Sequence, residues 1–67
     1  MRVLLRHRQT KRYVGPKQAW VDKPKAQDYN NVASAVQAAQ QHSSHAELEI
    51  LMSFEDPRYD ISLPLRP

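Results

Sequence analysis

Residues 30–42 are the one part of this chain that has the pattern of a helix. Asn30 or Asn31 can serve as its N-cap, and no Gly or Pro follows before His42. Apolar residues recur there at the i, i+3, i+4, i+7 spacing that places side chains on one side of a helix. They are Val32, Ala35, Val36 and Ala39. This pattern predicts a helix over about 31–42, with small side chains that allow close packing on a sheet.

The segments before and after this helix alternate between apolar and polar residues, as strands do. A first hairpin is predicted over 2–21, in which Val3 and Leu5 share one side of a strand and Leu4 faces the other. A second hairpin is predicted over 46–65. Its first strand places alternate apolar residues on one side: Ala46, Leu48, Ile50, Met52 and Phe54.

A hairpin, a helix and a second hairpin predict an α+β fold with the order ββαββ. We expect a four-stranded antiparallel sheet with the helix packed on one face, all within a single domain over 1–67. A right-handed crossover favours the strand order 2-1-3-4, in which the first and third strands are neighbours. The helix stripe should then pack against Leu48, Ile50, Met52 and Phe54.

Several classes of function lack the residues that they require. The chain has no Cys, which excludes disulfides and thiolate metal sites, and its single Gly disfavours loops that cradle phosphate. His42 and His45 form a His-x-x-His pair, but a metal site needs three or four ligands. We therefore predict no catalytic residue, no metal site and no cofactor, and we expect the protein not to be an enzyme.

The N-terminal segment does not have the pattern of a secretory signal. Its longest apolar run is Val3–Leu5, whereas a signal peptide needs about 7–15 apolar residues. No stretch approaches the roughly 18 apolar residues that span a membrane. We expect a cytoplasmic protein with no membrane partner.

Charge is distributed unevenly along the chain. Residues 1–25 contain eight Lys or Arg residues and one acid, whereas residues 26–67 contain two Lys or Arg residues and six acids. One interpretation is that the arginines of the first strand face Glu47 and Glu49 of the third, since opposite charges across two strands stabilise a sheet. The other is a surface that binds phosphates or a partner. Its candidate residues are Arg2, Arg6, Arg8, Lys11, Arg12, Lys17 and, as a stacking surface or buried core residue, Trp20.

Two functional hypotheses follow. The first is a small non-enzymatic protein-interaction module, which includes self-association through Leu4 and Leu51 on the sheet face opposite the helix. The alternative is a nucleic-acid-binding module that uses the basic N-terminal hairpin.

One series of residues is similar to a pattern found in short bacterial proteins of unknown function. The pattern is Thr-x-x-aromatic, then Trp, then Ala-x-x-aromatic and Ala, across a hairpin and the start of a helix. Here it is carried by Leu5, Thr10, Tyr13, Trp20, Ala26, Tyr29 and Ala35, and the resemblance covers roughly residues 4–39. Lys11 stands at a turn position that would prefer Gly. The resemblance implies an α+β fold and no activity.

Overall fold

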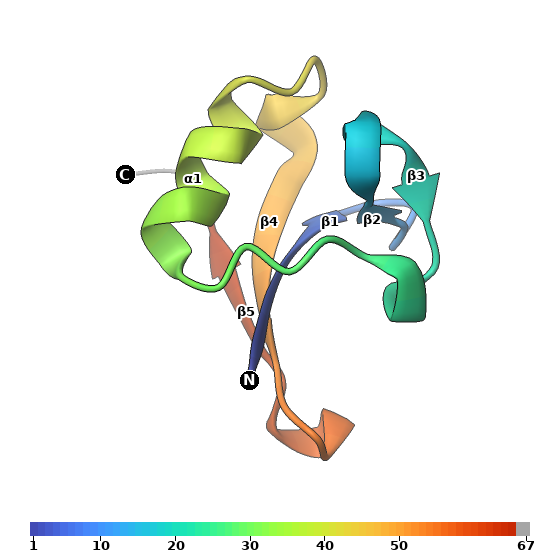
Figure 1. Ribbon diagram of the computed structural model, residues 1–67, viewed down its shortest axis with the longest axis vertical. Coiled ribbons are helices and arrows are strands. Elements are labelled where there is room, and N and C mark those ends of the chain that lie inside the picture. Colours follow the sequence, from blue (N-terminus) through green and yellow to red (C-terminus); the bar gives the residue numbers. More distant parts are fainter. Residues whose placement is uncertain (66–67) are drawn as a thin grey trace.

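The computed structural model describes residues 1–65 of the chain (Figure 1). One helix, α1 (Val32–Gln40), packs on a five-stranded antiparallel sheet. The strands are β1 (Arg2–His7), β2 (Tyr13–Val14), β3 (Trp20–Val21), β4 (Leu48–Ser53) and β5 (Ile61–Pro64). Short 3₁₀ turns interrupt the connections: η1 (Pro16–Gln18), η2 (Lys23–Lys25), η3 (His45–Glu47) and η4 (Pro57–Tyr59). The last two residues of the predicted domain 1–67 lie outside the described residues.

The strand order is β3-β2-β1-β4-β5, with β1 and β4 at the centre. The α+β class, the antiparallel sheet and the single helix are confirmed, and so is the pairing of the first strand with the first strand after the helix. The expectation of four strands in the order ββαββ was wrong. The predicted hairpin 2–21 contains three strands, because β3 turns back along β2 and becomes an edge of the sheet.

The turn between β2 and β3 explains why the third strand was missed. Lys17 and Gln18 both have a positive φ, 59° and 62°, and the Ala19 N–H donates to the Pro16 carbonyl at 3.3 Å. Two-residue hairpin turns of this handedness usually contain Asn-Gly, which adopts positive φ at little cost. The Lys-Gln pair carries no such signal. The residue before this turn, Gly15, packs closely on Val21. A Cβ at this position would lie 2.9 Å from the Val21 side chain, so a larger residue would force a shift.

Helix α1 begins as predicted and ends earlier. The Ser34 N–H donates to Asn31 Oδ1 at 2.8 Å, so Asn31 is the N-cap, and regular helix stops at Gln40 rather than near His42. Ala35 and Ala39 face the sheet and are fully buried, and Val36 is partly buried beside them. Val32 is exposed, which corrects its expected place in the stripe.

The helix covers one face of β1 and β4 and closes the larger core, which we call the helix-face core (Figure 1). Leu48 and Ile50 belong to it as predicted, whereas Met52 and Phe54 are only partly buried and do not belong to it. Its buried members are Val3, Leu5, Val14, Ala35, Ala39, Leu48 and Ile50.

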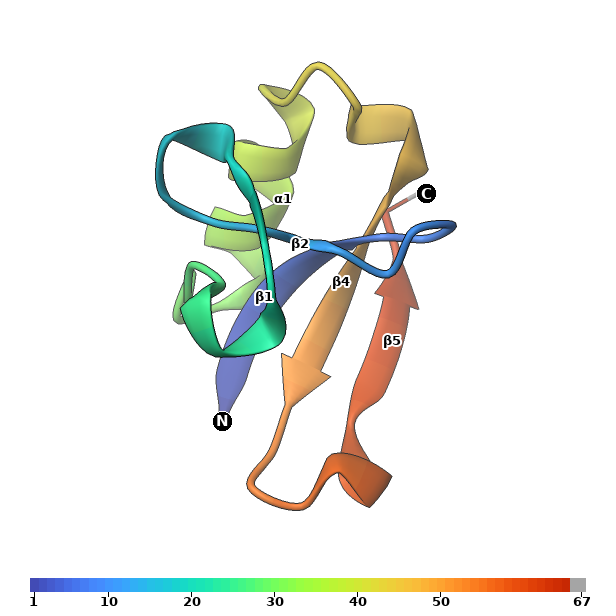
Figure 2. The same cartoon turned by 90° about the vertical axis from the view of Figure 1, so that its right-hand side faces the viewer.

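The opposite face of the sheet is also covered. The segment between β2 and α1, residues 15–31, passes over this face and is called the strap here (Figures 1 and 2). It includes the short edge strand β3. Leu4 and Leu51 pack with Tyr13 of β2 and Ala26 of the strap in a second, strap-face core. Leu4 is 0% and Leu51 3% exposed, so the expectation that they lie on an open face was wrong.

Side chains near the N-terminus hold the strap in place. Arg2 donates to the carbonyls of Lys23 and Ala26 at 3.4 and 2.9 Å, and Asp28 Oδ1 accepts the Val3 N–H at 3.1 Å. The Tyr29 N–H donates to the Val3 carbonyl. These bonds satisfy backbone groups that have no regular ladder of their own, and they lie beside the part of β1 that the short β2 does not reach.

Candidate nucleic-acid interface

The arginine near the C-terminal end of β1 stabilises the sheet. Arg6 lies directly opposite Glu49 of β4, and Arg6 Nε donates to Glu49 Oε2 at 2.6 Å. The Ser62 hydroxyl donates to Glu49 Oε1 at 2.8 Å. Burial opposes the ionisation of Glu49, but the hydrogen bonds from Ser62 and Arg6 outweigh it and lower the pKa of the carboxyl. The predicted pairing of opposite charges across the two strands is confirmed for this pair.

The other two arginines of the first segment bind backbone carbonyls. Arg2 holds the strap, and Arg8 donates to the Ala46 carbonyl at 2.9 Å. Glu47, the expected partner of an arginine, instead accepts from His7 Nε2 at 2.6 Å. The contacts of Arg2 and Arg8 lie at the two ends of β1, so both arginines, like Arg6, have partners within the fold.

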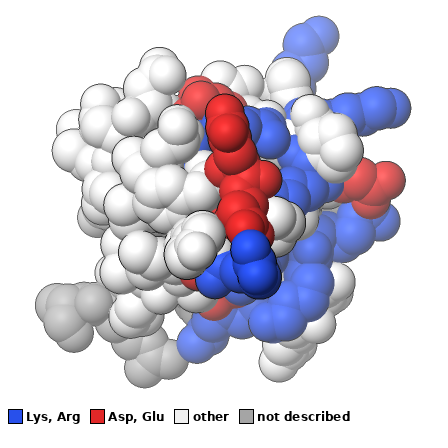
Figure 3. Space-filling view, turned by 90° about the horizontal axis from the view of Figure 1, so that it is seen from below, with Lys and Arg blue, Asp and Glu red and all other residues white. Residues whose placement is uncertain are grey.

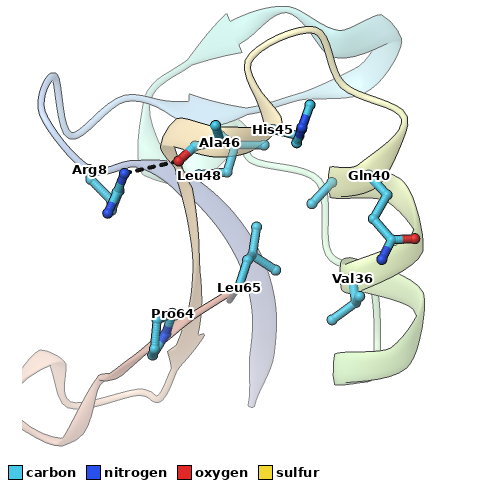
Figure 4. Close-up of a pocket in the computed structure, with 9 residues that line it drawn as sticks. Arg8, Val36, Gln40, His45, Ala46, Leu48, Pro64 and Leu65 are labelled. Carbon is cyan, nitrogen blue, oxygen red and sulfur yellow. Dashed lines mark hydrogen bonds between the residues drawn. The ribbon is translucent and has the colours of Figure 1, made fainter. Parts of the chain in front are cut away.

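Arg8 also lies at one end of an apolar groove between α1 and β5 (Figure 4). The groove has a volume of about 230 Å³. Val36 from the helix faces Leu65, which follows β5, and Leu48 of β4 lies at the end near Arg8. The helix therefore does not fully cover the sheet face on which it packs, and the uncovered part lies next to β5.

Three lysines on turns around β2 and β3 form no ion pair within residues 1–65. Lys11 lies between β1 and β2, Lys17 between β2 and β3, and Lys25 in η2. All three are exposed. Lys23, by contrast, binds Asp60 at 2.6 Å and joins the strap to the β4–β5 hairpin. The free cations are thus on the turns, and the strand arginines serve the fold.

Trp20 lies among these turns with its side chain half covered. It is 37% exposed, so it is not a core residue, and part of its ring is accessible as the alternative of a stacking surface requires. Arg12 donates to the Trp20 carbonyl at 3.3 Å and lies 3.8 Å from Asp22, with both partners exposed. Trp20 and Arg12 line a cleft of about 290 Å³, together with His7, Thr10 and Ser44.

The surface separates charged and uncharged regions. Lys and Arg gather on the side away from the helix, whereas the helix side shows almost none (Figure 3). Residues 29–46, which include all of α1, contain no Asp, Glu, Lys or Arg. A polyanion would therefore meet the molecule on the side of β2, β3 and the strap.

The predicted residues divide into two sets. In the first set, Arg12 and Trp20 lie together, with Lys11 and Lys17 on adjoining turns. The second set makes contacts within the fold and consists of Arg2, Arg6 and Arg8. Lys25 was not singled out from the sequence, although a lysine beside a proline in a polar turn carries the same signal as Lys17. The contributions of His7, Thr10 and Ser44 to the cleft had no sequence signal, because they depend on how β3 folds back.

Within the part of the chain that the structure describes, no three His, Asp or Glu side chains gather to hold a metal ion, and no helix is long and apolar enough to cross a membrane. No protein-family model, curated protein or solved structure matches the chain.

Proposed function

We propose that this protein is a small binding module, not an enzyme, and that it contacts single-stranded nucleic acid through the turns around β2 and β3. The observation that carries the proposal is the set of free cations on those turns, Lys11, Lys17 and Lys25, beside the half-exposed ring of Trp20. Lysines bind backbone phosphates, and an aromatic ring stacks on bases that are not held in a duplex. Single strands fit better than duplexes because, among residues 1–65, no helix or long ribbon projects from this side toward a groove.

The test is the binding of a fluorescently labelled mixed-sequence oligonucleotide, single-stranded or duplex, followed by anisotropy at low salt. We expect a preference for the single strand and a log–log salt slope of about −2, as three phosphate contacts would give. Quenching of Trp20, the only tryptophan, should accompany binding.

Two triple variants with the same net charge distinguish binding at a specific surface from binding that depends on net charge alone. Lys11→Gln, Lys17→Gln and Lys25→Gln remove three positive charges from the turns, and binding should be lost. Ala33→Glu, Ser34→Glu and Gln37→Glu add three negative charges to exposed positions of α1 and should weaken binding far less. Equal losses in the two triples, or no binding by the wild type at low salt, would refute the proposal.

A second candidate, protein interaction, is favoured by the groove between α1 and β5. Its apolar lining includes Val36, Leu48 and Leu65, and such a surface can accept an apolar side chain from a second copy of the chain. Self-association through Leu4 and Leu51, predicted from the sequence, cannot occur because both side chains are buried. Light scattering over a concentration series tests this candidate. Val36→Lys should dissociate any dimer, and a wild type that stays monomeric throughout would remove self-association.

A further inference from the structure

Three aromatic rings from distant parts of the chain meet at the C-terminal end of α1. The indole of Trp20 in β3 lies between two imidazoles, with centroid distances of 5.4 Å to His7 and 5.2 Å to His42. Both histidines are almost fully buried, at 8% and 5% exposure. The cluster joins the end of β1, the edge strand β3 and the turn after the helix, and it is separate from the lysines of the proposed binding surface.

Each imidazole also holds the turn that follows it. The N–H groups of Gln9 and Thr10 donate to His7 Nδ1 at 3.1 and 3.2 Å, and the Ser44 N–H donates to His42 Nδ1 at 3.0 Å. A ring nitrogen that accepts a hydrogen bond carries no proton. Both rings are therefore neutral in this arrangement, with their proton on Nε2.

The two Nε2 atoms have different surroundings. His7 Nε2 donates to Glu47 Oε2 at 2.6 Å. His42 Nε2 is buried and has no hydrogen-bond partner within residues 1–65.

The groups around His42 give no support to a positive charge on its ring. His45 Nδ1 lies 3.3 Å from the His42 carbonyl, and the cation of Arg12 donates to the backbone carbonyl of Trp20. Two carboxylates of this region have other partners, because Glu47 accepts from His7 and Asp22 lies 3.8 Å from Arg12. Charging His42 would thus remove an acceptor from Ser44 and place a charge in a buried site that lacks a counter-ion.

We propose that His42 is a proton-sensitive latch on Trp20. The neutral ring holds the turn at Ser44 and packs against the indole. Protonation of Nδ1 places its N–H opposite the Ser44 N–H, so that two donors meet and the hydrogen bond is lost. The ring then leaves the cluster, which exposes Trp20 and the edge of β3. This pH response goes beyond the proposed function, because it requires no nucleic acid.

Trp20 fluorescence of the full chain tests the latch. Between about pH 8 and pH 5, the range in which imidazoles titrate, the emission maximum should shift to the red as Trp20 becomes exposed, while circular dichroism stays native. His42→Asn keeps an oxygen that can accept from Ser44 and cannot be protonated near neutral pH, so its emission should not change. His45→Asn, at an exposed imidazole, should behave as the wild type does.

Two outcomes would overturn the assignment. One is an emission maximum that stays constant in the wild type, and the other is a shift that persists in His42→Asn or disappears in His7→Asn instead. Long-range ¹H–¹⁵N correlation spectra of the wild type give an independent check that needs no variant. They should show His42 Nδ1 without a proton at pH 8, and a protonated Nδ1 there would contradict the latch.

Discussion

The two faces of the sheet are covered in different ways. On one side a regular helix satisfies its own backbone and presents only small apolar side chains, Ala35 and Ala39, to the sheet. On the other side an irregular strap lies over Leu4 and Leu51, and its polar backbone must be satisfied by neighbours. Arg2 and Asp28 do this, and the ion pair of Arg6 with Glu49 lies on the same face.

Backbone strain follows the same division. Within residues 1–65, non-glycine residues with positive φ all lie between positions 11 and 30, and none lies in α1, β4 or β5. They are Lys11, Lys17, Gln18 and Asn30. A face covered by irregular chain thus requires charged side chains and strained turns. This requirement explains why many charged side chains of the N-terminal half make contacts within the fold and are not available to bind a ligand.

The largest expected effect tests whether both faces are true cores. Leu4 and Leu5 are adjacent, both 0% exposed, and face the strap and the helix respectively. Leu4→Ala and Leu5→Ala should each lower the free energy of unfolding by about 2–5 kcal/mol, because each leaves a cavity. Urea denaturation measures this loss, and the milder Leu4→Val and Leu5→Val serve if the alanine variants do not fold. A near-neutral Leu4→Ala would mean that the strap covers its face only loosely.

The next largest effect is a loss of stability at acid pH. It arises from three carboxylates on the strap side, those of Asp28, Glu49 and Asp60. Hydrogen bonds from Asn30 and Val3 lower the pKa of Asp28, and those from Lys23 and Phe54 lower the pKa of Asp60. The pKa of Glu49 is lowered as well. These carboxylates stabilise the fold fully above their unfolded pKa of about 4, and this contribution is lost as the pH falls through the lower folded values.

Thermal unfolding between neutral pH and pH 3 measures this loss. Glu49→Gln should be less stable than the wild type at neutral pH and should lose less stability on acidification. An unchanged difference between the two proteins across the whole range would show that folding does not lower the pKa of Glu49.

The smallest expected effect is relief of strain in the strap. Gln18→Gly should raise the free energy of unfolding by about 0.5–1 kcal/mol, because glycine adopts positive φ without steric cost. The matched change on the helix side, Gln37→Gly, should lower it by about 1 kcal/mol. Chemical denaturation of the two variants gives both values. Destabilisation by Gln18→Gly would indicate that the Gln18 side chain makes a needed contact.

More of the helix side than of the strap side was predictable from sequence. Asn31 as N-cap and the burial of Ala35 and Ala39 follow from local periodicity. On the strap side, the pairing of Arg6 with Glu49 follows from strand register. The path of the strap depends on contacts between side chains and backbone across the chain, such as Arg2 with Ala26, and on a Lys-Gln turn with no glycine signal. Burial of Leu4 and the position of Trp20 between two histidines both depend on that path.

The central pairing of the sheet also determines when the chain can fold. Strand β1, residues 2–7, pairs along its whole length with β4, residues 48–53. During synthesis, the apolar run Val3–Leu5 therefore has no strand partner until β4 has also left the ribosome. High sequence separation of this kind slows folding and lengthens the exposure of an unpaired strand. Arg2 and Arg6, placed at either end of that run, then act as charged gatekeepers against aggregation before they have a structural partner.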